Sequence, residues 1–117
     1  MPQDDPVRLR HILDSTERAL RIASRHRRED LDSDEEFELA LTKAIEVIGE
    51  AASRVGDECR ARNPQVPWLD IVAMRHRLVH GYYEVNLDIL SNTVAMDLPP
   101  FLSEIRGAIE REEARRG

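Results

Sequence analysis

The chain has 117 residues, of which 41% are hydrophobic and 34% charged, and its formal net charge is −6. This length predicts one domain over residues 1–117, with room for a single core. The acidic balance excludes a general nucleic-acid binder held by counterion release, so any contact with RNA is expected at a local site.

The ends and the cysteine content indicate a compartment. No apolar run approaches the roughly 20 residues that span a bilayer, so no membrane partner is expected. The N-terminus, Met-Pro-Gln-Asp-Asp-Pro, lacks the basic and apolar regions of a signal peptide. The single cysteine, Cys59, cannot form an internal disulfide. These features predict a cytoplasmic protein.

The first two predicted helices precede residue 63. Asp5-Pro6 predicts a capped helix start, and that helix ends in the charged stretch 25–32. Ser33 with Glu36 predicts a capping box for a second helix, which Asn63-Pro64 stops. Gly49 and Gly56 within it favour a close approach of another helix over a break.

Two or three further helices complete the pattern. Pro67 opens a third, which we expect to end near Gly81. Asn86 is predicted to cap a fourth, and Pro99-Pro100 must kink or restart it because proline removes a backbone donor. The predicted fold class is all-α, an antiparallel up-down helical bundle of four to five helices.

Candidate chemistry is concentrated at the end of the third helix. A helical wheel places Arg75 near the middle of an apolar face, where a guanidinium is costly without a partner or ligand. The alternatives are a functional arginine and a structural ion pair with Glu46 or Glu50. The apolar face is formed by Trp68, Ile71, Val72, Met74, Leu78 and Val79.

His80 follows Arg75 at the expected helix end, where the helix dipole favours an imidazolium. Its alternative is an ordinary surface histidine. His76 and His80 also have the i, i+4 spacing of two metal ligands, but no third ligand is evident, so zinc is a weak interpretation and no metal or cofactor is expected. Tyr82 and Tyr83 follow directly, and ordinary packing is the alternative role for each.

These residues resemble the HepT-like toxins of the HEPN superfamily, small helical bundles that pair with a minimal nucleotidyltransferase. The similarity covers most of the chain and is strongest in Met74-Arg75-His76-Arg77-Leu78-Val79-His80-Gly81-Tyr82. The family motif Arg-x-x-x-x-His-x-Tyr corresponds to Arg75, His80 and Tyr82. Many members have Asn directly after the arginine, where this chain has His76, an auxiliary candidate.

The resemblance implies a metal-independent endoribonuclease, the toxin of a type II or type VII-like toxin–antitoxin module. Arg75 and His80 would be catalytic, and Tyr82 would accept AMP from the nucleotidyltransferase antitoxin. The implied partners are RNA, such as tRNA or mRNA, the antitoxin, and a second copy in a homodimer. The alternative is a non-catalytic subunit that docks the nucleotidyltransferase or presents a substrate to it.

Overall fold

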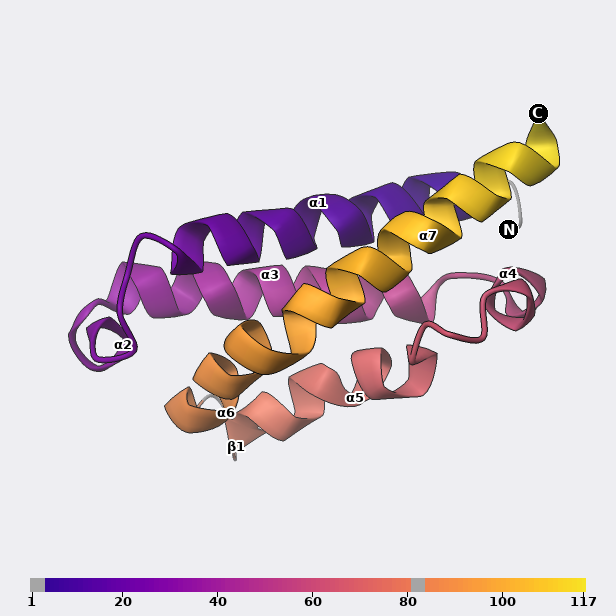
Figure 1. Cartoon of the computed structure of the whole chain (residues 1–117). Helices are drawn as coiled ribbons and strands as arrows, with labels where there is room; N and C mark the ends of the chain where they lie inside the picture. The colour runs from indigo at the N-terminus through magenta and orange to yellow at the C-terminus, as the bar shows by residue number, and fades with distance from the viewer. Residues whose placement is uncertain (1–3, 81–83) are drawn as a thin grey trace.

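The computed structural model describes residues 4–80 and 84–117, with the backbone alone for residues 79 and 80 (Figure 1). Its elements, in chain order, are α1 Asp5–Ala23, α2 Asp30–Ser33, α3 Glu35–Ser53, α4 Asp57–Arg62, α5 Trp68–Leu78, β1 Val79–His80, β2 Glu84–Val85, α6 Leu87–Asn92, a π-helical turn Thr93–Asp97 and α7 Leu98–Arg116.

Four longer helices form the bundle. α1 and α3 run antiparallel side by side, α5 lies along the other side of α3, and α7 crosses α1 so that both chain ends lie together (Figure 1). The directions alternate from α1 to α3, α5 and α7, which confirms the predicted all-α, up-down bundle.

The core is built from one apolar stripe on each helix. Burying a side chain of this size stabilises the fold by about 1.5–3 kcal/mol, so the stripes account for the packing of helices that are individually marginal. Its fully buried members include Leu9 and Ile12 of α1, Ile45 and Ile48 of α3, Met74 and Leu78 of α5, and Leu98 and Ile105 of α7.

The start of α1 differs from the prediction. Asp4, not Asp5, is the residue before the helix, and Asp5 is 6% exposed. The Asp5 carboxylate accepts a hydrogen bond of 3.0 Å from the backbone N–H of Gly56. The side chain therefore joins α1 to the loop between α3 and α4 instead of capping its own helix, a partner that local spacing cannot reveal.

The capping residue of α3 was also predicted wrongly. Ser33 ends the short helix α2, and Asp34 adopts an extended backbone and accepts a hydrogen bond of 3.1 Å from the N–H of Phe37. An extended backbone at the capping residue lets the side-chain carboxylate accept from the free N–H groups in the first turn of the helix. Ser33, being helical, is not in this position.

The second predicted helix is divided in two. α3 ends at Ser53, and Gly56 stands before α4, so the expectation of an unbroken helix to residue 63 is wrong. The expectation for Gly49 is confirmed: a Cβ there would lie 3.5 Å from the carbonyl oxygen of Ile71 on α5. Gly56 instead marks a break, because the chain turns there to meet Asp5.

After residue 78 some of the predicted helix boundaries are confirmed and others are wrong. α5 ends at Leu78, not near Gly81, and Val79 pairs with Val85 in a two-residue antiparallel ladder. Asn86 caps α6 as predicted, its side-chain oxygen accepting from the N–H of Ile89 at 3.0 Å. The π-helical turn precedes Pro99-Pro100, which occupy the first turn of α7, confirming the predicted restart. Gly81 lies outside the described residues.

Candidate functional site

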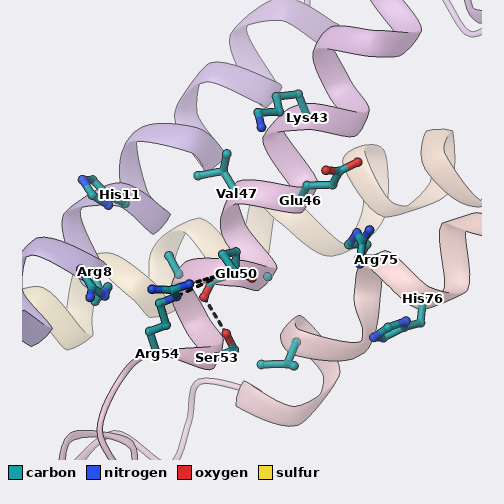
Figure 2. Close-up of a pocket in the computed structure, with 13 residues that line it drawn as sticks. Arg8, His11, Lys43, Glu46, Val47, Glu50, Ser53, Arg54, Arg75 and His76 are labelled. Carbon is teal, nitrogen blue, oxygen red and sulfur yellow. Dashed lines mark hydrogen bonds and ion pairs between the residues drawn. The ribbon is translucent and has the colours of Figure 1, made fainter. Parts of the chain in front are cut away.

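A groove of about 680 Å³ lies between α1, α3 and α5, and it contains part of the predicted site (Figure 2). We call it the basic groove. It falls within the range of about 300–1,000 Å³ typical of ligand pockets. Its basic lining residues are Arg8, His11, Lys43, Arg54, Arg75 and His76, and its acidic ones are Glu46 and Glu50.

Arg75 is exposed, one turn before the end of α5. Arg75 falls within the arc of the helix that the buried residues of α5 occupy, as the wheel predicted, but its own side chain is exposed and not enclosed by them. Those buried residues are Trp68, Ile71, Met74 and Leu78.

The structural alternative for Arg75, an ion pair with Glu46 or Glu50, is not observed among the described residues. Glu50 pairs with Arg54 instead, at 2.7 Å and four residues apart on α3 (Figure 2). The Arg75 guanidinium therefore makes no ion pair with the described residues, although Glu46 and Glu50 line the same groove, and it is available to an anionic ligand.

The remaining candidate residues divide between described and undescribed parts of the chain. His76 is exposed and lines the basic groove beside Arg75 (Figure 2). The backbone of His80 lies in β1, where it pairs with Glu84, two residues past the helix end. The side chain of His80, and Tyr82 and Tyr83 altogether, lie outside the described residues.

Sequence reasoning missed the contribution of α1 and α3 to this groove. His11, which lies far from the motif in sequence, lines the groove with Arg8 and Lys43 (Figure 2). The available signal was the three-residue step from Arg8 to His11, which places both on one face of a helix. That signal is weak alone, because a stepwise pattern does not say which other helix the face meets.

A buried polar network fixes the start of α5. Asn63 is fully buried, and its backbone carbonyl accepts a hydrogen bond of 3.0 Å from the indole N–H of Trp68. Its side-chain amide donates to Glu112 of α7 at 3.0 Å. The network therefore links Trp68, the first residue of α5, to Glu112 of α7. This link holds the first turn of α5, the helix that carries Arg75, against the rest of the bundle.

Two groups in and beside that network have shifted pKa values. Hydrogen bonding from Arg62 holds the pKa of the Glu112 carboxyl below its usual range, and Asn63 adds to the effect. Burial raises the pKa of the Cys59 thiol to about 11, so this cysteine is a packing residue and not a nucleophile.

Among the described residues there is neither a candidate metal site nor a candidate membrane span. The side chains of residues 4–78 and 84–117 include no group of three or more His, Cys, Asp and Glu placed to hold a metal ion. No helix in that same part of the chain is long and apolar enough to cross a bilayer.

Comparison with known proteins supplies the family. The model of the family described as "Ribonuclease HepT-like" matches residues 12–107 of the chain, which include Arg75, His76 and His80. The chain belongs to this family. Membership supports a ribonuclease function for this HepT-like chain, with RNA as its substrate.

Individual relatives agree with this assignment. The chain is 30% identical over 105 residues to "Putative RNase TTE0752" of Caldanaerobacter subterraneus subsp. tengcongensis, covering 90% of this chain and 94% of that protein. It is 31% identical over 83 residues to "Probable ribonuclease HepT" of Thermococcus cleftensis, covering 71% and 72% respectively. No solved structure matches the chain.

Proposed function

We propose that this HepT-like chain is a metal-independent endoribonuclease that acts in the cytoplasm as the toxin of a toxin–antitoxin module of type II or type VII-like organisation. Its antitoxin partner would be a nucleotidyltransferase. The observation that carries the proposal is Arg75: an exposed guanidinium in a basic groove, without an ion pair among the described residues, in a chain of the HepT-like ribonuclease family.

The chemistry follows from the groups of the motif. A ribose 2′-oxygen bonds to the adjacent phosphorus while the bond from phosphorus to the 5′-oxygen breaks, leaving a 2′,3′-cyclic phosphate and a 5′-hydroxyl. A base takes the proton of the 2′-hydroxyl and an acid gives one to the leaving 5′-oxygen. Arg75 stabilises the charge that develops on the phosphorane oxygens, and His80 carries one of the proton transfers.

A homodimer completes the pair of proton-transfer groups. Each chain has one His80 in the motif, and cleavage benefits from both a base and an acid. A two-fold axis near the ends of the two α5 helices brings a second His80 to the same cleft. His76 lines the basic groove beside Arg75 and is the auxiliary candidate for holding the phosphate.

The test is an RNA-cleavage assay with purified protein, free of its partner, on total RNA and tRNA. Wild type is expected to produce ends bearing a cyclic phosphate. Arg75→Ala and His80→Ala are each expected to lower the rate by about 10²-fold or more. Arg77→Ala is the matched control, since Arg77 is an exposed arginine of the same helix that does not line the basic groove.

Two results would contradict the proposal. Undiminished cleavage by His80→Ala would show that the histidine of the motif does not take part in the reaction. If the wild-type protein leaves RNA intact but still binds a nucleotidyltransferase, the other candidate is favoured. That candidate is a non-catalytic subunit that docks the nucleotidyltransferase or presents its substrate. The acidic net charge of −6 is the observation that favours this second candidate.

A further inference from the structure

The basic groove extends well beyond the motif residues on α5. Arg8 and His11 come from α1, and Lys43 comes from α3, so three helices contribute cations to one concave surface (Figure 2). Its lining has four Arg and Lys side chains (8, 43, 54 and 75) and two Glu (46 and 50), a balance of 4 − 2 = +2 with neutral histidines. The chain as a whole carries −6, so the groove opposes the charge of the molecule around it.

Two of these cations, in addition to Arg75, are available to a ligand. Arg54 is neutralised by Glu50, at 2.7 Å. Arg8 and Lys43, by contrast, make no ion pair with any of the described residues, and the Nε atom of Arg8 is buried without a hydrogen-bond partner there. Leaving a buried guanidinium nitrogen without a hydrogen-bond partner costs free energy. An anion in the groove would bind the other nitrogens of the same guanidinium and so hold the side chain in place.

The lining also indicates which part of a nucleic acid would contact it. The described residues of the groove include no Phe, Tyr or Trp, so they offer no platform on which an unpaired base stacks. Arg and Lys side chains instead bind phosphate oxygens, a contact that positions a strand without reading its sequence. The groove is therefore suited to the backbone of an RNA strand.

We propose that Arg8 and Lys43 bind the backbone phosphates of the RNA strand next to the phosphate held by Arg75. The strand would run from the end of α5 across α3 to α1, and its binding there would be independent of base sequence. This inference rests on the proposed ribonuclease function and adds to it the residues that hold the substrate beside the scissile phosphate.

The experiment measures binding separately from cleavage. The probe is a 2′-O-methyl RNA strand of about 12 nucleotides, which lacks the attacking hydroxyl, and its affinity is measured by fluorescence anisotropy at several salt concentrations. Each phosphate contact on a single strand contributes about −0.7 to the slope of log affinity against log salt. Arg8→Gln and Lys43→Gln should each weaken binding several-fold and reduce the steepness of the slope by about 0.7.

Matched variants separate charge from packing. Lys43 is exposed, so its replacement leaves the core intact, whereas Arg8 is half-buried. Arg8→Lys keeps the charge and should restore most of the lost slope. Arg21→Gln removes an exposed cation of α1 that does not line the groove, and it should leave the slope unchanged. In cleavage assays, Arg8→Gln and Lys43→Gln should raise KM more than they lower kcat.

Failure of this inference is distinct from failure of the proposed function. Unchanged salt slopes in Arg8→Gln and Lys43→Gln, with cleavage by wild type still dependent on His80, would overturn the groove assignment alone. Changed slopes without cleavage by wild type would overturn the nuclease and retain the groove. If AMP or ATP displaces the strand at concentrations where inorganic phosphate does not, the groove is a mononucleotide site and the inference is wrong.

Discussion

Arg62 of α4 and Glu112 of α7 form an ion pair of 2.6 Å, and the Glu112 side chain is only 10% exposed. The same carboxylate accepts a second hydrogen bond, of 3.0 Å, from the buried amide of Asn63. Because Asn63 also holds the indole of Trp68, the pair connects α4 and α7 to the first residue of α5. The network therefore couples the stability of the bundle to the position of the helix that carries Arg75.

Removing the carboxylate should destabilise the fold. Glu112→Ala leaves one N–H of the Asn63 amide and the Arg62 guanidinium without their acceptor, which costs about 1–3 kcal/mol of unfolding free energy. Urea denaturation measures the change. Glu113→Ala is the matched control, because its ion pair with Arg10 is long, at 3.7 Å, and exposed, so its loss should cost less than about 0.5 kcal/mol. Equal losses in the two variants would contradict this account.

The same ion pair predicts a pH dependence. Hydrogen bonding from Arg62 lowers the pKa of Glu112 in the folded chain relative to its unfolded value of about 4.3. Its contribution is therefore fully present above the unfolded pKa and is lost as pH falls through the folded pKa.

The stability difference between wild type and Glu112→Gln should accordingly be largest near neutral pH and shrink in acid. Denaturation curves recorded from about pH 7 down to about pH 3 measure it. A difference that stays constant over this range would show that the carboxylate charge does not stabilise the fold.

The predicted and observed structures agree where local pattern decides the outcome. The apolar stripes of the longer helices, the Asn86 cap and the restart at Pro99-Pro100 all depend on near neighbours in sequence. They disagree where a distant partner decides it. Asp5 was predicted to cap its own helix, but its carboxylate bonds to Gly56, 51 residues away. The second predicted helix is interrupted at the same loop.

The candidate site divides in the same way. Arg75 of the motif and the auxiliary candidate His76 both line one groove, whereas the side chain of His80 and all of Tyr82 lie outside the described residues. Periodicity placed Arg75 among the apolar residues but could not show that its side chain is exposed, because a wheel gives an angle on one helix and not the position of its neighbours. Arg8 and Lys43 were missed for the same reason, since only the packing of α1 and α3 against α5 brings them beside Arg75.

A homodimer built on residues 67–81 and the helix that follows Asn86 is the next prediction. Leu69 of α5 is 79% exposed and Met96 of the π-helical turn is 70% exposed, and exposed apolar side chains on this region favour a buried interface. Light scattering of wild type should give the mass of two 13.5-kDa chains.

Charge at that surface should dissociate the dimer. Leu69→Glu combined with Met96→Glu places like charges across a two-fold axis, and the expected product is a folded monomer with little cleavage activity. Leu39→Glu is the control, because Leu39 is also exposed, at 55%, but lies on α3. A wild-type monomer, or a dimer unaffected by both substitutions, would contradict the predicted interface.

The last prediction concerns Tyr82 as the acceptor of AMP from the partner nucleotidyltransferase. Tyr82 is two positions after His80, and two steps along the chain span at most about 7 Å even when extended. An AMP group on its phenol would therefore bring a phosphate close to the proposed catalytic histidine. It would compete with RNA for Arg75 and repel the phosphates of an incoming strand.

Mass spectrometry after co-expression with the nucleotidyltransferase should find AMP on Tyr82, and the modified protein should neither cleave RNA nor bind the 2′-O-methyl strand with the affinity of the unmodified protein. Tyr82→Phe should escape modification and remain active in the presence of the partner. Tyr83→Phe is the neighbouring control and should be modified as fully as wild type. AMP found on Tyr83 in place of Tyr82, or a modified protein with undiminished cleavage, would show that Tyr82 is not the regulatory acceptor.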